Sequence, residues 1–353
     1  MGSEMCIRDR YKISGHWDHY KDGMFVLGDE EKDKEVFALR PMTCPFQYQA
    51  YLNRKRSYRD LPLRYNETST LFRNEASGEM HGLIRVRQFT ISEGHLMCTP
   101  EQLEDEFRKC LELAIFMLKT LGLYEDVSYR FSQWDPNDRA KYIGTEEQWN
   151  EAQGLMERIL NHLEIPYEIG IGEAAFYGPK LDIQIKNVYG KEDTLITIQI
   201  DQMLAEQFGM VYTDRDGKQK TPCIIHRTSI GCYERTLALL IEKYAGAFPL
   251  WLAPVQVKLL PIADRHLDYL YEVKKQLEDK GFRCEVDDRS EKIGYKIREA
   301  QLEKVPYMVV VGDKDIENNT ISIRKRKEGD LGAMTVEQFL EKIVPDRDNK
   351  VID

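Results

Sequence analysis

The sequence predicts an α+β protein in which antiparallel strands and amphipathic helices come first and a smaller α/β domain follows. Polar and apolar residues alternate over 181–185 and 195–201, which is typical of antiparallel strands with one wet face. Apolar residues recur at helical spacing over 103–118, and a second amphipathic helix is expected over 146–163. Beyond residue 253, strand-like runs alternate with amphipathic helical runs, which indicates a compact α/β domain.

The first long helix has clear end signals. Thr99 can cap it, Pro100 suits its first turn, and Gln102 stands at the capping-box position, while Gly122 follows its end. In the last part of the chain we expect strands at 255–261, 283–286, 307–311 and 320–324, and helices at 267–280, 291–303 and 336–343.

Composition limits the class of protein. The 353 residues suggest two domains, and 42% apolar with 31% charged residues marks a soluble globular protein. The net charge of −10 argues against general affinity for nucleic acid, so an RNA partner would need local basic patches such as 54–56 or 324–327. No apolar run approaches the roughly 20 residues that span a bilayer.

Cysteine usage and the amino terminus add two expectations. Seven cysteines, an odd number without a CxxC pair, argue against a disulfide framework and for a reducing cytoplasm. Residues 1–10 are short and polar, and we expect them to be a non-native or disordered leader rather than a signal peptide.

The stretch 71–95 carries the strongest chemical signal. It is expected to form a strand, a polar loop and a second strand over 83–90, with Arg73, Glu75 and Arg85 around the loop and Phe89 behind them. Arginine forks match phosphate oxygens and an aromatic ring stacks on a base, so the group suits a nucleotide. A salt-bridged surface hairpin fits the same charge pattern, and the residues alone leave both readings open.

Several ordered blocks resemble the class II aminoacyl-tRNA synthetases, and among them the threonyl-tRNA synthetases. They are FRNE…RVRQF, GHWDHYKDGMF, RPMTCP, SYRDLPLR, GEAAFYGPK, IIHRTSIGCYER and EKIGYKIREAQLEKVPYMVVVGDK. The resemblance implies a class II antiparallel sheet flanked by helices over residues 11–253, then an α/β anticodon-binding domain with a mixed sheet over 254–353. The first class-defining motif and the editing modules are not found, so we expect an amino-terminally truncated catalytic domain.

The resemblance also implies a nucleotide site. Arg73 would neutralise the α-phosphate, Phe89 and Arg235 would hold the two faces of adenine, and His16 would assist the transfer step. The residues expected to bind ATP are Arg73, Glu75, Arg85, Phe89, Gln199 and Arg235, and those expected to be catalytic are His16, Arg73 and Arg235. Mg²⁺ is expected to accompany ATP.

A metal site is implied by resemblance rather than by spacing. Cys44, His95 and His226 are far apart in sequence, and each alone is more often a structural residue than a ligand. They match the three positions that hold one Zn²⁺ per chain in threonyl-tRNA synthetases, which would leave a position open for substrate. An open zinc position could read the hydroxyl by which threonine differs from valine, since an apolar pocket separates such isosteres weakly. Glu93 and Tyr177 are expected to contact threonine.

The implied partners are tRNA(Thr), ATP and L-threonine, with a homodimer in the full-length protein and no membrane. Arg298 and Arg324 match positions that contact anticodon bases, and Asp315 keeps an acceptor where the family carries glutamate. Among other departures, Ile91 stands where commoner bacterial enzymes carry glutamine, and it cannot make an amide hydrogen bond to substrate.

The expected function is therefore that of a threonine–tRNA ligase, which makes threonyl-adenylate and transfers threonine to tRNA. A non-catalytic tRNA-binding or regulatory paralogue is the first alternative, which the absence of threonine-dependent pyrophosphate exchange would favour. A synthetase for another amino acid, most plausibly proline, is the second, and it would not need zinc on Cys44.

Overall fold

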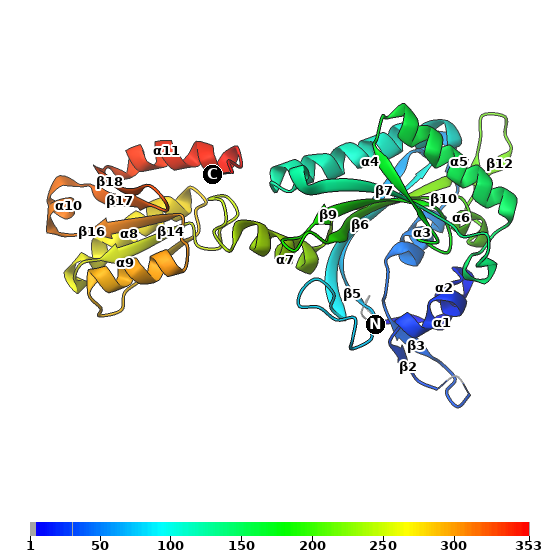
Figure 1. Ribbon diagram of the computed structural model, residues 1–353, viewed down its shortest axis with the longest axis horizontal. Helices are drawn as coiled ribbons and strands as arrows, with labels where there is room; N and C mark the ends of the chain where they lie inside the picture. The colour runs from blue at the N-terminus through cyan, green and yellow to red at the C-terminus, as the bar shows by residue number, and fades with distance from the viewer. Residues whose placement is uncertain (1–4, 30, 353) are drawn as a thin grey trace. The chain divides into compact units, whose positions relative to one another are not determined.

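The computed structural model describes residues 5–29 and 31–352 of the chain (Figure 1). The chain forms two compact units that divide after Leu239. Of the predicted leader, residues 1–4 lie outside the described part, and 5–10 belong to the short strand β1 (Met5–Ile7) and the start of α1 (Arg8–Ile13). The predicted domain limits, 11–253 and 254–353, stay predictions.

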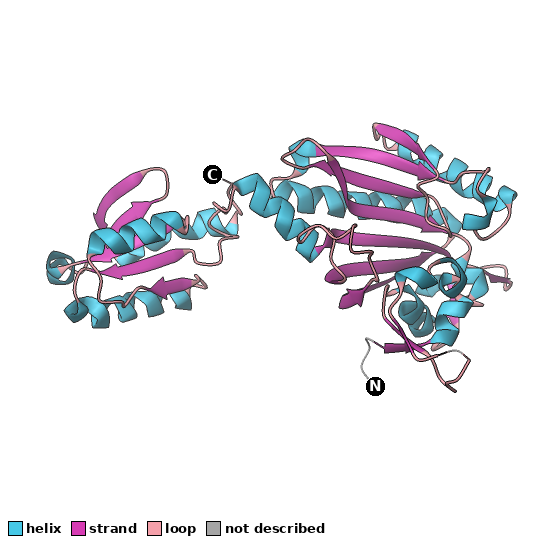
Figure 2. Ribbon diagram, turned by 60° about the horizontal axis from the view of Figure 1, so that its bottom comes forward, coloured by secondary structure: helices cyan, strands magenta, loops and turns pink. Residues whose placement is uncertain are grey.

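Within the described residues, the larger unit is built on a seven-stranded sheet in the order β5-β6-β13-β10-β9-β7-β8 (Figure 2). Neighbouring strands are antiparallel, except that β8 runs parallel to β7. The strands are β5 (Leu63–Phe72), β6 (Gln88–Cys98), β7 (Val127–Gln133), β8 (Tyr167–Ile171), β9 (Lys180–Lys186), β10 (Glu192–Asp201) and β13 (Cys223–Cys232). The predicted antiparallel sheet is confirmed, and β9 and β10 contain the strands predicted at 181–185 and 195–201.

Both predicted long helices are present. Helix α4 (Pro100–Thr120) begins where the Thr99 backbone N–H donates to Gln102 Oε1 at 3.0 Å, and Gly122 follows its end with φ +73°. It packs across β13, β10 and β6, while α5 (Glu146–His162) contacts β10. The other helices of this unit are α2 (His16–His19), α3 (Cys44–Leu52), α6 (Leu204–Gln207) and α7 (Tyr233–Tyr244), which continues across the division between the units.

Two small sheets complete the larger unit. One pairs β1 with β3 (Phe37–Leu39) and β3 with β2 (Val26–Leu27). The other joins β4 (Arg56–Ser57), β11 (Tyr212–Thr213) and β12 (Gln219–Lys220).

The strand predicted at 83–90 is wrong over most of its length. Strand β6 begins only at Gln88, directly opposite Phe72, where β5 ends. Residues 83–87 therefore have no strand beside them to pair with, and they lie in a loop that folds back through a bridge between His81 and Arg85. The arginines of this stretch consequently stand on a loop at the end of the β5–β6 hairpin, not on a sheet face.

The smaller unit holds a mixed sheet in the order β15-β14-β16-β17-β18, as predicted. Strand β14 runs parallel to β15 and β16, whereas β17 is antiparallel to both its neighbours. Its elements are β14 (Val257–Pro261), α8 (Leu267–Asp279), β15 (Cys284–Val286), α9 (Ile293–Leu302), β16 (Tyr307–Val311), α10 (Asp313–Asn318), β17 (Ile321–Lys325), β18 (Gly329–Met334) and α11 (Val336–Asp348). Helix α10 and strand β18 were not predicted.

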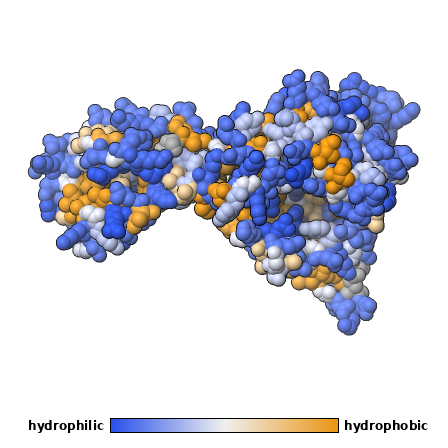
Figure 3. All heavy atoms as spheres, viewed as in Figure 1, coloured by the Kyte–Doolittle hydropathy of each residue, from blue (hydrophilic) through white to orange (hydrophobic). Residues whose placement is uncertain are grey.

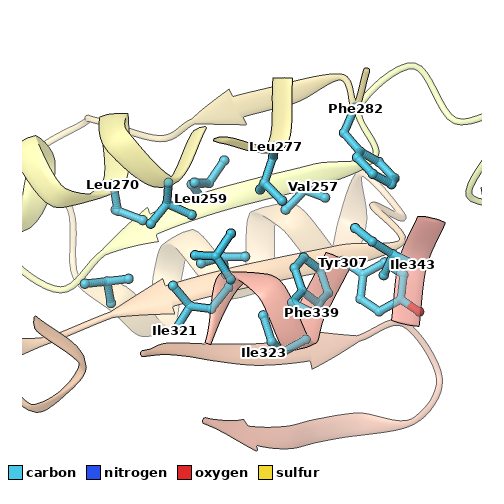
Figure 4. Close-up of a cluster of buried hydrophobic side chains, with 14 of the residues drawn as sticks. Val257, Leu259, Leu270, Leu277, Phe282, Tyr307, Ile321, Ile323, Phe339 and Ile343 are labelled. Atoms are coloured by element: carbon cyan, nitrogen blue, oxygen red, sulfur yellow. The ribbon is translucent and has the colours of Figure 1, made fainter. Parts of the chain in front are cut away.

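The core of the smaller unit lies between its sheet and helices α8 and α11 (Figure 4). Val257 and Leu259 of the sheet meet Leu277 of α8, and Tyr307 packs edge-to-face on Phe339 of α11 with ring centroids 5.3 Å apart. A separate cluster that includes Leu260, Ala300 and Met308 places α9 on the opposite face. The unit is therefore a three-layer α/β structure.

Polar side chains cover most of the face shown in Figure 3, in keeping with the charged composition. Among the described residues, no helix has the length and apolar character needed to cross a membrane. The cysteines whose side chains are described are free thiols: Cys44, Cys98, Cys110, Cys223, Cys232 and Cys284.

Candidate active site

Two rows of polar side chains cross one face of the larger sheet, because directly opposed residues of antiparallel strands point to the same side. The first row contains Lys180 on β9, Gln199 on β10, His226 on β13 and His95 on β6, each opposite the next. The second row lies two residues along each strand and contains the opposed pairs Asp182–Thr197 and Thr228–Glu93. The polar face predicted for β9 and β10 is thus present, but on β9 it is buried rather than wet.

A cavity of about 250 Å³ opens over these rows. Every residue predicted to bind ATP or threonine lines it, and so does His226: Arg73, Glu75, Arg85, Phe89, Glu93, Tyr177, Gln199 and Arg235. The sheet supplies one wall, and the loop after β5 and the start of α7 supply the others. The antiparallel fold therefore gathers residues that are up to 162 positions apart in the sequence.

Arginine and phenylalanine meet at one end of this cavity. The Arg73 guanidinium carbon lies 5.0 Å from the centre of the Phe89 ring, and its Nε donates to the Pro41 carbonyl at 3.3 Å. The ring is buried at the start of β6. A cation held beside an aromatic face in this way can contact both a phosphate and a base.

Arg235 links α7 to the loop between β5 and β6. Its Nε donates to the Ile84 carbonyl at 2.9 Å, and its Nη1 donates to the Thr194 carbonyl at 2.6 Å. Burial lowers the pKa of the guanidinium, which still stays charged at neutral pH. On the same loop, Arg85 pairs with Glu75 at 3.6 Å. These contacts hold several predicted nucleotide-binding groups in one place.

The other end of the cavity is built around Tyr177. Its hydroxyl donates to Gln199 Oε1 at 2.7 Å, and its ring stacks on the His226 ring with centroids 5.1 Å apart. Burial raises the pKa of Tyr177, so the phenol remains a hydrogen-bond donor. Glu93 accepts a hydrogen bond from the Thr43 hydroxyl at 2.5 Å, which fixes its carboxylate at the same end.

His95 and His226 face each other through ring nitrogens that are 3.0 Å apart. The outer nitrogen of His95 lies 2.9 Å from Gln47 Oε1, and the outer nitrogen of His226 lies 2.9 Å from Asp201 Oδ2. Because these oxygens accept hydrogen bonds, they favour protons on both outer nitrogens, an arrangement that leaves lone pairs on both inner nitrogens.

In that arrangement the two facing lone pairs could together bind one metal ion. Burial, aided by the neighbouring His226, lowers the pKa of His95 well below its usual value, so the imidazole is neutral and has a lone pair available for a metal ion. A tetrahedral zinc ion with bonds of 2.0–2.1 Å would separate two ligating nitrogens by roughly 3.3 Å, close to the spacing seen. The histidine pair therefore fits one side of a metal site, with Gln47 and Asp201 orienting the ligands.

Cys44 is the third predicted ligand. It begins α3 and lines a second cavity of about 420 Å³ that His226 also lines. Burial raises the pKa of its thiol, with further contributions from Glu93 and Asp201. Among the described residues, no group of three or more histidine, cysteine, aspartate or glutamate side chains is arranged to hold a metal ion. The structure thus joins two of the three predicted ligands and places the third in a neighbouring wall.

His16 also lines the second cavity, which shares Arg73, Glu93, Tyr177, Gln199 and His226 with the first. Its Nδ1 lies 2.7 Å from the Ser14 hydroxyl, and its ring packs edge-on against Phe176. Burial, with smaller effects from His226 and Arg73, lowers the pKa of His16 to about 3, so the imidazole is neutral at neutral pH.

Several supporting residues were not predicted. A buried Asp182 accepts hydrogen bonds from Ser132 at 2.6 Å and Thr197 at 2.7 Å and pairs with Lys180 at 2.8 Å. Arg40 makes a two-pronged contact with Glu67, both bonds being 2.6 Å. For Asp182 and Thr197, the available signal in the sequence was the polar positions of the alternating runs 181–185 and 195–201. The Arg40–Glu67 contact depends on pairing between distant segments.

In the smaller unit, Arg298 and Arg324 belong to one face. Arg324 lies opposite Met308, on the side of the sheet that α9 covers, and lines a basic cavity of about 300 Å³ together with Gln301. Arg298 is exposed one turn before Gln301 on α9, so it stands on the same side of that helix. Asp315 differs, because its carboxylate accepts hydrogen bonds from the Gly312 N–H and the Ser322 hydroxyl, both at 2.9 Å.

Comparison with known families agrees with this architecture. Residues 25–244 match the tRNA synthetase class II core domain (G, H, P, S and T), and residues 256–345 match an anticodon binding domain. The chain belongs to the class II aminoacyl-tRNA synthetases.

The individual relatives are threonine-specific by name. A threonine–tRNA ligase of Clostridium perfringens is 64% identical over 340 residues, which is 96% of this chain and 53% of the relative. One from a Geobacillus species is 47% identical, over 94% of this chain and 51% of that protein. The chain spans about half the length of the curated relatives it matches.

Solved structures give the same result. One is titled the RNA binding domain of threonyl-tRNA synthetase from Cryptosporidium parvum, and it superposes with a TM-score of 0.89 at 32% identity, over 97% of this chain and 84% of that one. A putative threonyl-tRNA synthetase from Aeropyrum pernix gives 0.80 at 26% identity, over 99% and 82%. The resemblance to threonyl-tRNA synthetases is confirmed.

Proposed function

We propose that the chain is the catalytic and anticodon-binding part of a threonine–tRNA ligase. It would activate L-threonine with ATP to give threonyl-adenylate and pyrophosphate, and then transfer threonine to the 3′ end of tRNA(Thr). The observation that carries this proposal is a single cavity that has an arginine–phenylalanine pair at one end and, at the other, His226, whose ring faces the buried His95.

In the first step, a threonine carboxylate oxygen attacks the α-phosphorus of ATP and pyrophosphate leaves. Arg73 would neutralise charge on the α-phosphate, and Arg235 and Phe89 would hold the two faces of adenine. Glu75 would contact the adenine side, Arg85 the distal phosphates, and Gln199 the nucleotide from the sheet. All of them line the cavity, so catalysis would rest on positioning and charge neutralisation. Mg²⁺ is expected with ATP.

At the amino-acid end, Glu93 and Tyr177 would contact threonine, and Cys44, His95 and His226 would hold one Zn²⁺. When bound, the metal would supply a Lewis-acid contact for an amino group and a hydroxyl. The orientation of His95 by Gln47 and of His226 by Asp201 supports this assignment. For Cys44, its place in the wall shared with His226 is the supporting observation.

The transfer step would use the second cavity. The 3′-terminal ribose of tRNA would approach His16, whose neutral imidazole can accept a hydrogen bond from an attacking hydroxyl and orient it. At the other end of the tRNA, Arg298 and Arg324 would contact anticodon bases. Asp315 is proposed to act there as an acceptor, though two hydrogen bonds within its own unit already engage its carboxylate.

Two further proposals concern the setting of the enzyme. The full-length protein is proposed to be a homodimer, as the resemblance implies. The cytoplasm is its proposed location, because the described cysteines are all free thiols.

Amino-acid-dependent ATP–pyrophosphate exchange tests the proposal. With each of the twenty amino acids supplied in turn, threonine should drive exchange far better than proline or valine. Arg73→Ala should abolish it, while Arg54→Ala, which removes an exposed arginine outside the cavity, should not. Exchange driven by proline would contradict the proposal, and so would a folded chain that binds tRNA but supports no exchange at all.

A further inference from the structure

One buried hydroxyl in the wall of the active-site cavity has no partner. Thr228 lines the cavity and is only 8% exposed, and its Oγ1 makes no hydrogen bond to the described part of the chain. Buried polar groups in folded proteins are nearly always hydrogen-bonded, because leaving one unpaired costs about 1–3 kcal/mol. An unpaired hydroxyl next to a binding cavity therefore calls for a partner from the ligand.

The position of Thr228 in the sheet indicates which part of the ligand it would meet. It lies directly opposite Glu93, two residues along β13 from His226, which lies opposite His95. Strand alternation puts all four side chains on the cavity face. Immediately after Thr228 the register between β13 and β6 shifts, so the regular ladder stops at this pair.

Apart from Glu93, the β6 residue beside the Thr228 hydroxyl on the cavity face is apolar. Ile91, the next residue of β6 on the cavity face, lines the same cavity and offers no hydrogen bond. On the cavity face of these two strands, the Glu93 carboxylate and the Thr228 hydroxyl lie between Ile91 and the two histidines, and Arg227, the next residue of β13, also lines the cavity.

We propose that Thr228 is a specificity-determining residue whose hydroxyl hydrogen-bonds the β-hydroxyl of bound threonine opposite Glu93. The inference rests on the proposed function and deepens it. A hydroxyl has one donor and two acceptor positions, so the substrate can donate to the Glu93 carboxylate while it accepts from Thr228. Valine, with a methyl group in that place, would leave the Thr228 hydroxyl without a partner and the Glu93 carboxylate with the Thr43 hydroxyl alone. The pair thus adds to the discrimination between threonine and valine.

The test compares Thr228→Val with Thr228→Ser in the whole chain, using pyrophosphate exchange and calorimetric titration with threonine. The valine variant replaces only the hydroxyl, by a methyl group. KM and Kd for threonine should therefore rise about tenfold while KM for ATP is unchanged. Exchange with valine should change little, so the threonine-to-valine ratio of kcat/KM should fall by about the same factor. The serine variant, which keeps the hydroxyl, should retain most of the wild-type affinity.

Stability separates this role from a structural one. Replacing an unpaired buried hydroxyl by a methyl group should leave the thermal midpoint equal or higher, whereas losing a structural hydrogen bond would lower it. Ser69→Ala is the matched control, because its buried hydroxyl also has no partner among the described residues but lines neither cavity. It should change neither KM nor the ratio.

Two results would overturn the inference. An active wild-type chain whose Thr228→Val variant keeps the threonine KM would show that the hydroxyl has no role in binding. Equal losses for threonine and valine would show that it contacts a group common to both, not the β-hydroxyl. A wild-type chain without threonine-dependent exchange would instead contradict the proposed function itself, so the two failures can be told apart.

Discussion

At the scale of single residues, the metal proposal depends on which ring nitrogens carry protons. Asp201 holds the outer nitrogen of His226 at 2.9 Å and, with its other oxygen, accepts from the backbone N–H groups of Met203 and Leu204. An acidic group in this place raises the basicity of the inner nitrogen and fixes the ring. The hydrogen bonds that Asp201 makes at the start of α6 thus help to fix the orientation of the His226 ring.

Asp201→Asn should weaken zinc binding while preserving the fold. An asparagine Oδ1 can still cap α6, but the amide –NH2 then faces the outer nitrogen of His226 in place of an accepting oxygen. The tautomer that leaves the inner nitrogen free is no longer favoured, so zinc affinity should fall about 10–100-fold. Competition with a chromogenic chelator measures this. Asp214→Asn, which changes a carboxylate paired with Lys220 away from either cavity, should leave zinc affinity unchanged. Equal affinities for the Asp201→Asn variant and wild type would contradict the assigned role.

Phe89 is expected to act on the nucleotide alone. Phe89→Leu keeps an apolar side chain but removes the ring, so KM for ATP should rise about three- to tenfold with KM for threonine unchanged. Exchange kinetics with each substrate varied in turn provide the measurement. Phe116→Leu on the outer face of α4, where the side chain is 58% exposed, should alter neither constant. A change in the KM for threonine alone would contradict the assignment of Phe89 to the nucleotide end of the cavity.

At the scale of elements, an ion cluster joins the start of α10 to the segment before α8. Asp313 accepts from Arg265 Nη2 at 2.5 Å and from Nε at 2.8 Å, and lies 3.0 Å from His266 Nε2. The Arg265 hydrogen bonds, followed by that of His266, hold the pKa of Asp313 well below its usual 3.8. A carboxyl with a lowered folded-state pKa stabilises the fold above its unfolded-state pKa and loses that contribution as pH falls below it.

Asp313→Asn should therefore lower the thermal midpoint of the smaller unit at neutral pH. The difference from wild type should be full above about pH 4 and should shrink as the pH is lowered further, because the wild-type carboxyl then takes up a proton. The effect should be small, since the cluster is exposed to solvent. Calorimetric scans between pH 7 and pH 2.5 would check it, and a difference that stays constant over that range would rule out this ionisation as its cause.

The elements predicted well are those with a strong period. Polar and apolar residues alternate cleanly in strands β9 and β10. The sequence of α4 shows both apolar residues at helical spacing and its capping residues. Strand β18 was missed because Gly329 and Gly332 take positive φ values in a run with little β-forming character, and the six polar-rich residues of α10 show no helical period. Residues 83–87 have strand-forming composition without a neighbouring strand, which no local pattern reveals.

The candidate site likewise contains residues that could be predicted from the sequence and residues that could not. Resemblance placed the arginines, Phe89 and the histidines, but the partners that orient them depend on register between strands. Gln47 meets His95 across 48 positions, and Asp182 collects its partners from two other strands. Thr228 gave no signal in the sequence, because its importance follows from an unpaired oxygen that only the folded chain makes visible.

At the scale of the whole molecule, charge is distributed unevenly. The chain carries a net charge of −10, yet the basic run 324–327 lines one cavity of the smaller unit. This local concentration suits contact with an RNA loop without general affinity for nucleic acid. The two cavities described for the larger unit instead combine arginines with carboxylates and histidines.

The ratio of threonine- to valine-dependent pyrophosphate exchange, measured on one sample before and after zinc removal, tests the proposed site most directly. The isolated chain should contain one zinc ion and favour threonine by about a thousandfold or more, as a site built to bind a hydroxyl does. Chelation should abolish most of the threonine-dependent exchange, and added zinc should restore both the rate and the ratio. Threonine-dependent exchange that survives complete removal of the metal with its selectivity intact would contradict the proposed site.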